Sequence, residues 1–157
     1  MKRGFTRAAW LIVAALLMIE SVLGPIGVGI QLMVAGVSAS FDEEPLPTWV
    51  WPAALAAILV AALVLFVAGI NVSRTDLSVG RRVALVGAAG LNVLVTADAS
   101  GDARTLATNF DEYRRMGFTT SDLIGDVVVA VVTLVVALAC LLRSLTARPS
   151  AVGHALH

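Results

Sequence analysis

The chain has 157 residues, of which 59% are hydrophobic and only 14% are charged. A soluble domain carries about 25% charged residues, because its surface must be hydrated. This composition therefore excludes a free soluble enzyme, a disordered chain and a basic protein that binds nucleic acid. Eleven basic residues balance eleven acidic ones, so the net charge indicates no partner. We expect an integral membrane protein in contact with the lipid bilayer.

Cysteine and histidine are too scarce to build a cofactor site. Cys140 is the single cysteine, and the two histidines, His154 and His157, lie in the C-terminal tail. No internal disulfide can form, and no histidine is available within the apolar segments to hold haem or a metal ion. We expect no cofactor and no bound metal. Only Lys2 among the basic residues is lysine, which, with the Ala and Val content, is typical of a GC-rich bacterial genome.

Four apolar segments are each about long enough to cross a bilayer, which requires about 20 apolar residues in a helix. They cover residues 8–36, 49–72, 83–97 and 123–142, of which the third is short. We predict an all-α membrane protein, a single domain over 1–157, with four transmembrane helices in an antiparallel bundle. The tail over 149–157 is expected to be flexible.

The first segment carries both an acid and a proline. Glu20 lies about 12 residues from the start of the segment, which at about 1.5 Å per residue is near the middle of the bilayer. An ionised carboxylate is costly there, and no lysine or arginine lies within any of the four segments. Asn92 lies at a similar depth and is the expected hydrogen-bond partner. Pro25 removes a helical hydrogen bond, so Gly24 and Pro25 are expected to form a kink, a break or a hinge.

Small and polar residues recur at helical spacing in each segment, which is typical of helix packing in lipid. In the first segment they are Glu20, Gly24, Gly27 and Gln31. In the fourth they include Asp126, one turn inside the helix start at Asp122. Glu20, Gln31, Asn92 and Asp126 are the candidate polar sites inside the membrane, with structural, partner-contact and transport roles all left open.

The connection before the fourth segment is the only sizeable hydrophilic stretch. Ala103, Leu106, Phe110 and Tyr113 recur at the spacing of one helical face, and Gly117 is suited to end a helix. We predict a short amphipathic helix over 102–116 on the outer surface. A candidate docking site for a partner consists of Phe110, Tyr113, Arg114 and Arg115, residue types that often dominate interfaces.

The charges predict the orientation of the chain. With the N-terminus inside, eight basic residues lie in inner segments and three in outer loops, as the positive-inside rule requires. We predict a multi-pass protein of the bacterial inner membrane with cytoplasmic N- and C-termini.

No catalytic constellation accompanies these spans, and we predict no enzymatic activity. Our leading hypothesis is an accessory or interaction subunit of a bacterial membrane complex, partnered by other membrane proteins or by copies of itself, with no nucleic acid. The alternative is a small proton- or cation-coupled transporter that uses Glu20. A weaker alternative is a lytic membrane protein of the phage type.

Overall fold

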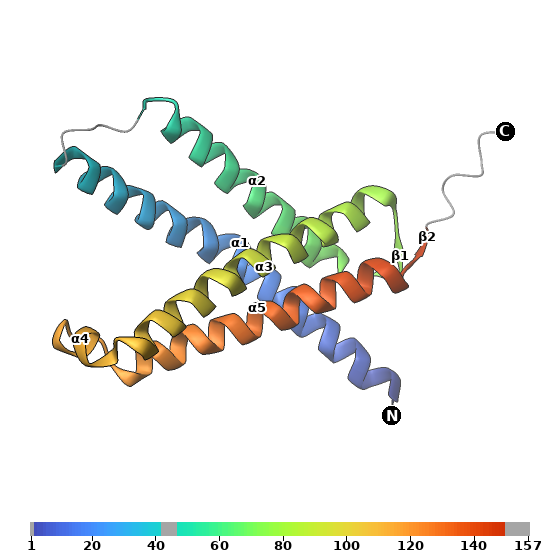
Figure 1. Ribbon diagram of the computed structural model, residues 1–157. Coiled ribbons are helices and arrows are strands. Elements are labelled where there is room, and N and C mark those ends of the chain that lie inside the picture. The colour runs from blue at the N-terminus through green and yellow to red at the C-terminus, as the bar shows by residue number, and fades with distance from the viewer. Residues whose placement is uncertain (1, 42–46, 150–157) are drawn as a thin grey trace.

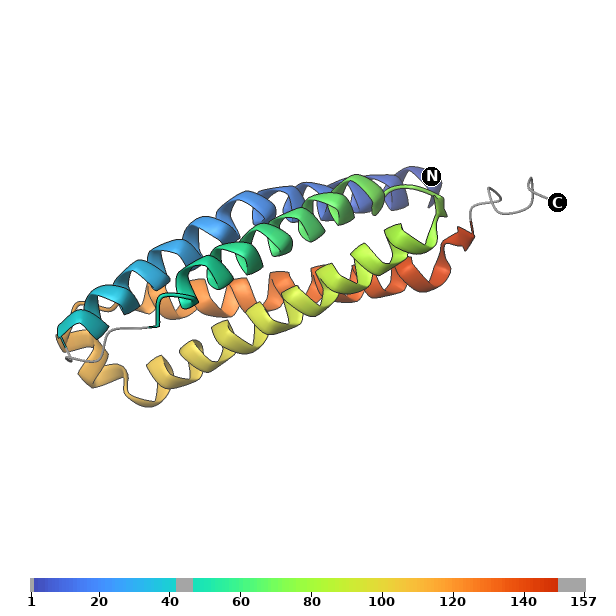
Figure 2. The ribbon, with the colours of Figure 1, turned by 90° about the horizontal axis from the view of Figure 1, so that it is seen from above.

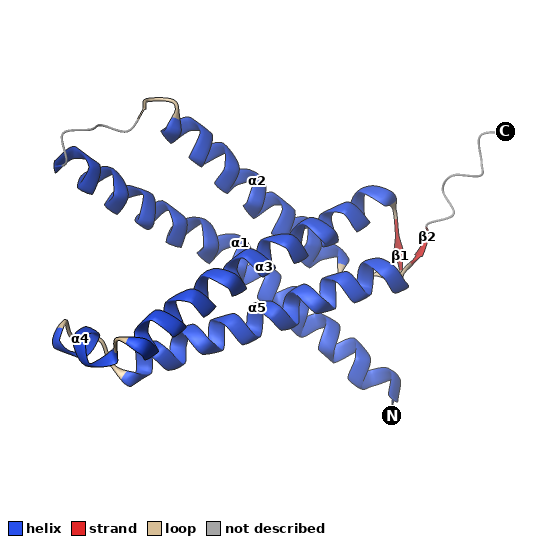
Figure 3. Cartoon of the chain, viewed as in Figure 1, coloured by secondary structure: helices blue, strands red, loops and turns tan. Residues whose placement is uncertain are grey.

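A computed structural model of the chain describes residues 2–41 and 47–149. Within these ranges the chain is almost entirely helical, as Figure 3 shows. Four of the described helices are long and apolar enough to cross a membrane. The expected all-α, four-span architecture is therefore confirmed at this level. Residues 42–46 and 150–157 lie outside the described residues. The first range includes the acidic residues Asp42, Glu43 and Glu44, and the second includes most of the predicted tail.

The first helix is longer than its predicted span, and the second matches its predicted span closely. Helix α1 covers Lys2–Phe41 and continues through Pro25 without interruption, so the expectation of a broken helix there is wrong. Glycines flank the proline, and the chain on either side keeps helical geometry even though Pro25 donates no hydrogen bond. Helix α2 covers Val50–Asn71, within one residue of the prediction at each end.

The third span is longer than the sequence indicated. Helix α3 covers Val79–Thr108, and its 30 residues give a length of about 45 Å at 1.5 Å per residue. Ala99, Ala103 and Leu106 are buried and continue the same helical face beyond the apolar segment. The helix therefore continues past Asp98, because doing so keeps this face packed.

The separate helix predicted over 102–116 is consequently wrong in its extent. Residues 102–108 belong to α3, the helix geometry is lost at Asn109, and only Phe110–Arg115 forms the short helix α4. Gly117 follows with a φ of +96°, a conformation that glycine adopts without steric cost, so its predicted role as a helix terminator is confirmed.

Helix α5 covers Thr120–Thr146 and begins with a capping box. The backbone N–H of Thr119 donates to Oδ2 of Asp122 at 2.6 Å, so Asp122 has the helix-start role expected of it. At the other end, the strand β2 (Arg148–Pro149) pairs in parallel with the strand β1 (Asp76–Leu77), which precedes α3. This pair was not predicted.

The helices form two hairpins that cross one another (Figure 1). One consists of α1 and α2 and the other of α3 and α5, and the two helices of each hairpin run in opposite directions. The most extensive contacts lie within the hairpins, followed by those of α2 with α3, whereas α1 touches α5 only briefly. Figure 2 shows the same helices from above as two pairs. The four helices therefore form two crossed pairs rather than the single antiparallel bundle we expected.

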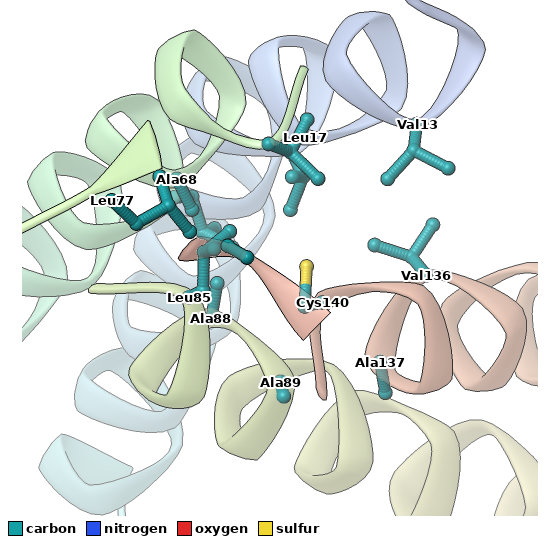
Figure 4. Packing of buried hydrophobic residues seen from close by; sticks show 13 residues of the cluster. Val13, Leu17, Ala68, Leu77, Leu85, Ala88, Ala89, Val136, Ala137 and Cys140 are labelled. Carbon is teal, nitrogen blue, oxygen red and sulfur yellow. The ribbon is translucent and has the colours of Figure 1, made fainter. Parts of the chain in front are cut away.

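The buried core lies toward one end of this assembly. We call this the arginine-rich end; it comprises the start of α1, the end of α2, the start of α3 and the end of α5. Figure 4 shows Val136 and Cys140 of α5 directed toward Val13 and Leu17 of α1. Leu17, Leu85, Val136 and Cys140 are each 0% exposed. The opposite end, which carries α4, has few buried residues on α1 and α2, so the hairpins are joined mainly at the arginine-rich end.

The close contact between α1 and α2 predicts unequal effects of enlarging two glycines. A Cβ atom at Gly69 would lie 3.2 Å from Cγ of Met18 and 3.3 Å from the carbonyl oxygen of Ala14, whereas nothing lies within 4 Å at Gly27. Gly69→Leu should therefore destabilise the protein by about 1–3 kcal/mol, as overpacking does. Gly27→Leu should leave the melting temperature in detergent unchanged. Equal melting temperatures for the two variants would contradict this packing.

The burial of Cys140 predicts a protected thiol. Because Cys140 is 0% exposed, the folded protein should not react with a maleimide in detergent and should react after unfolding. The control is Leu145→Cys in a Cys140→Ala background, since Leu145 is 80% exposed and should react at once. Rapid labelling of Cys140 in the folded protein would show that the core is not closed.

Candidate functional site

A cleft of about 690 Å³ opens where α1 diverges from α3 and α5. Its polar lining residues are Glu20 of α1, Asn92 of α3 and Thr133 of α5, and the remaining lining is apolar. Leu23 and Val128 also line it and are 60% and 52% exposed, so the cleft is open to the surroundings of the helices. It is therefore a lateral cleft with a small polar floor.

A second, apolar cleft of about 310 Å³ lies on the other side of α1, between α1, α2 and α3. Gly24, Leu65, Leu91 and Val95 line both clefts. The two hollows therefore adjoin each other beneath the middle of α1. The predicted hinge residues Gly24 and Pro25 lie at this point.

Three glycines in the middle of α1 are not covered by a neighbouring helix, whereas Gly36 nearer its end is covered by Trp51 of α2. A Cβ atom placed at Gly24, Gly27 or Gly29 would meet nothing within 4 Å. In membranes such small-residue faces normally allow another helix to approach closely, as Gly69 of α2 does against Met18. The stripe formed by Glu20, Gly24 and Gly27 was expected to pack within the protein, and instead it borders the cleft.

The structure brings Glu20 and Asn92 together, as counting residues from the membrane boundary predicted. Nδ2 of Asn92 donates to the carbonyl oxygen of Ala88 at 3.0 Å, and the Glu20 carboxyl group interacts with the same amide side chain across the cleft. Asn92 is only 2% exposed, yet its Oδ1 accepts no hydrogen bond within the described residues. A buried acceptor without a donor is costly, and it marks a place where an external donor would be stabilising.

Two threonines join α3 to α5 beside this pair. Oγ1 of Thr96 and Oγ1 of Thr133 are 2.8 Å apart, and each hydroxyl also lies within hydrogen-bond distance of a carbonyl oxygen of its own helix. This contact is a hydrogen bond between the two helices. Because its partners lie within the α3–α5 hairpin, it holds the polar floor of the cleft in place.

The other predicted intramembrane polar residues lie away from this cleft. Gln31 is exposed on α1 and has no hydrogen-bond partner among the described side chains. Asp126 is half-buried and lines a separate cavity of about 320 Å³ near α4, with Asp102 and Tyr113. Asp126 and Thr133 are seven residues apart, or about 10 Å along α5. The structure therefore does not join Glu20, Asn92 and Asp126 into one site.

The predicted docking residues divide between two environments. Tyr113 is half-buried and packs edge-to-face on Phe118, with ring centroids 5.4 Å apart, whereas Arg114 and Arg115 are exposed. Phe110 is half-buried at the start of α4. Tyr113 and Phe118 thus line the cavity around Asp126, and Phe110 does not. Phe118 was missed because it follows the terminating glycine and is outside the helical periodicity.

The arrangement around Glu20 offers hydrogen bonding rather than metal binding. Across residues 2–41 and 47–149, no three acidic, histidine or cysteine side chains come close enough to hold a metal ion. The carboxyl group of Glu20, the free Oδ1 of Asn92 and the hydroxyl of Thr133 can accept or exchange hydrogen bonds with a group that enters the cleft. The site is therefore suited to recognising a polar group carried by an apolar molecule.

Removal of the interhelical threonine bond should measurably loosen α3 from α5. We expect Thr133→Val to lower the free energy of unfolding by roughly 0.6 kcal/mol, the average for hydrogen bonds between helices in a membrane protein. The control is Thr146→Val, because Oγ1 of Thr146 bonds only to the carbonyl oxygen of Leu142 in its own helix. Unfolding in a denaturing detergent titration measures both variants, and a larger loss for Thr146→Val would contradict the assignment.

Comparisons of the chain with protein-family models, with curated proteins and with solved structures give no match.

Proposed function

We propose that this protein is a non-enzymatic interaction subunit of a bacterial membrane complex, and that its lateral cleft receives a transmembrane helix of a partner. The observation that carries the proposal is the uncovered glycine face of α1 beside a buried acceptor without a donor, Oδ1 of Asn92. Each feature alone is common in helical membrane proteins. Their coincidence in one open cleft supports a specific occupant.

The chemistry of the cleft favours a helix over a lipid chain. A lipid acyl chain fills apolar space but has no donor for Asn92 and no group to pair with Glu20. A helix with a serine, threonine, asparagine or glutamine at mid-membrane depth supplies such a donor. It also brings a surface that packs on Gly24 and Gly27. The partner is thus defined by an apolar span with one small polar residue near its centre.

The orientation in the membrane is part of the same proposal. The arginine-rich end gathers Arg7, Arg74, Arg81, Arg82 and Arg143 at one end of the spans. Such an excess of arginine favours the cytoplasmic side. With this orientation both termini are cytoplasmic, and the cleft opens toward the outer half of the inner membrane.

A proton- or cation-coupled transporter that uses Glu20 is the second candidate function, favoured by the position of that carboxyl group in an open cleft. Transport requires access from both sides of the membrane. Toward the arginine-rich end, Leu17, Val136 and Cys140 are fully buried below the cleft. This apolar layer lies between the cleft and the arginine-rich end, which favours the interaction role over transport.

Photo-crosslinking from inside the cleft tests the proposal. A photoreactive amino acid replaces Leu23, at the edge of the cleft, or Leu138, a lipid-facing control on α5 that is 57% exposed. After irradiation of intact cells, the linked peptides are identified by mass spectrometry. We expect position 23 to crosslink to the apolar span of one defined protein, or of a second copy of this chain, and position 138 to give lipid adducts only.

A variant that fills the cleft distinguishes crosslinks to a docked helix from crosslinks to a helix that collides by chance. Gly27→Leu should retain the fold but lower the crosslinking yield at position 23 by at least several-fold, because the added side chain occupies the helix-binding face. Lipid adducts alone at position 23, or a yield unaffected by Gly27→Leu, would overturn the proposal. Proton flux in proteoliposomes that is abolished by Glu20→Gln would favour the transporter instead.

A further inference from the structure

A pocket lined by charged side chains lies at the arginine-rich end, far along α1 from Glu20. It has a volume of about 610 Å³ and lies between the first turns of α1 and the connection from α2 to α3. Arg7 and Trp10 of α1, Arg74 and Asp76 of the connection, and Arg81 of α3 line it. Three arginines against one aspartate give the pocket a formal charge of +2.

The three guanidinium groups are free to bind a ligand. In the stretch of chain that the structure describes, the side chains of Arg7, Arg74 and Arg81 make no hydrogen bond and no ion pair, and Asp76 pairs with none of them. Like charges brought together without counter-charges repel one another. An anion in the pocket would remove that repulsion and receive several charge-assisted hydrogen bonds.

The neighbouring arginines have structural partners instead. Arg82 donates from Nη2 to the carbonyl oxygen of Ala147 at 2.5 Å, and Arg143 donates from Nη2 to the carbonyl oxygen of Arg74. The guanidinium group of Arg143 also lies 5.2 Å from the ring centroid of Trp10. These contacts fix the ring of Trp10 and the backbone at Arg74, so two walls of the pocket are preorganised.

We propose that this pocket binds the phosphate group of an anionic phospholipid. Arg74 and Arg81 hold the phosphate oxygens from two separate elements, and Arg7 closes the third side. Arginine suits this role because its planar group can bind two phosphate oxygens at once. The pocket has an apolar rim formed by Trp10 and by Leu11, which is 62% exposed. This rim places acyl chains along α1, where a free phosphate ion has nothing to contact.

The position of the pocket agrees with a lipid headgroup. Tryptophan is enriched where helices leave the hydrocarbon, and the apolar span of α1 begins at Arg7. The pocket is therefore at headgroup depth. Basic pockets between transmembrane helices on the cytoplasmic side are known to hold anionic headgroups. This inference rests on the arginine-rich end alone and does not depend on the occupant of the lateral cleft.

Lipid binding to purified protein in non-ionic detergent tests the proposal. Native mass spectrometry measures the dissociation constants of phosphatidylglycerol and of phosphatidylcholine for the wild type, for Arg74→Gln/Arg81→Gln and for Arg104→Gln/Arg115→Gln. Both variants remove two positive charges, but Arg104 and Arg115 lie at the opposite end. We expect the pocket variant to bind phosphatidylglycerol at least about tenfold more weakly, because it removes two guanidinium groups and a tenfold change corresponds to only about 1.4 kcal/mol. The control variant should bind like the wild type.

The remaining outcomes decide between sources of the phosphate. Inorganic phosphate at millimolar concentration should not displace the lipid. Full displacement would assign the pocket to a free anion and overturn the lipid assignment. Equal binding of phosphatidylglycerol and phosphatidylcholine would also overturn it. Equal weakening in both double variants would show a general charge effect and also overturn the proposal. Should Arg74→Gln/Arg81→Gln not fold, Arg7→Gln removes the third guanidinium group from the same pocket and must weaken binding as well.

Discussion

The contacts at the arginine-rich end, a buried apolar layer and one arginine hydrogen bond, hold the two hairpins together. Arg143 of α5 donates to the carbonyl oxygen of Arg74 in the connection that follows α2, whereas Arg82 of α3 donates to that of Ala147 and closes the end of the α3–α5 hairpin. In lipid, apolar side chains gain little by leaving the solvent for a neighbouring helix, because the solvent is itself apolar. Hydrogen bonds and close packing must therefore select the arrangement. The arginine side chains supply the hydrogen bonds at the arginine-rich end. The fully buried layer around Leu17 and Cys140 supplies the close packing.

Joining the hairpins at one end has a direct consequence at the other. Because the hairpins cross (Figure 1), the distance between α1 and the α3–α5 pair increases away from the core, and side chains no longer fill it. The cleft above Glu20 is the result. The glycine face of α1 then lies uncovered at the depth where Asn92 has an unpaired oxygen. The packing that stabilises the arginine-rich end thus creates the binding surface on which the proposed function rests.

The elements that could be predicted from sequence are those governed by local constraints. The spans could be located because the rise per residue of a helix and the thickness of a bilayer are both fixed. Counting residues from the start of each span placed Glu20 at the depth of Asn92. The continuation of α3 to Thr108 was missed, because the hydrophilic stretch after residue 97 was interpreted as an outer loop with a separate helix over 102–116, whereas packing against α5 favours one longer helix. The crossing of the hairpins and the β1–β2 pair depend on contacts between distant segments, which periodicity does not reveal. For the same reason, the stripe of Glu20, Gly24 and Gly27 was correctly identified as a face but assigned to internal packing.

The two kinds of contact in the cleft would contribute differently to binding. Hydrogen bonds between membrane helices contribute on average only about 0.6 kcal/mol, because polar groups of separated helices also find partners. A bond to Asn92 therefore cannot by itself hold a partner helix, since even a millimolar complex requires about 4 kcal/mol. Most of the affinity must come from close packing along Gly24 and Gly27, where the absence of side chains allows the backbones to approach. The polar floor acts on selection instead, because a span without a central polar residue would enclose Glu20 and Asn92 without satisfying them. Affinity is thus determined by the shape of α1, and specificity by the polar groups that α1 and α3 contribute at the same depth.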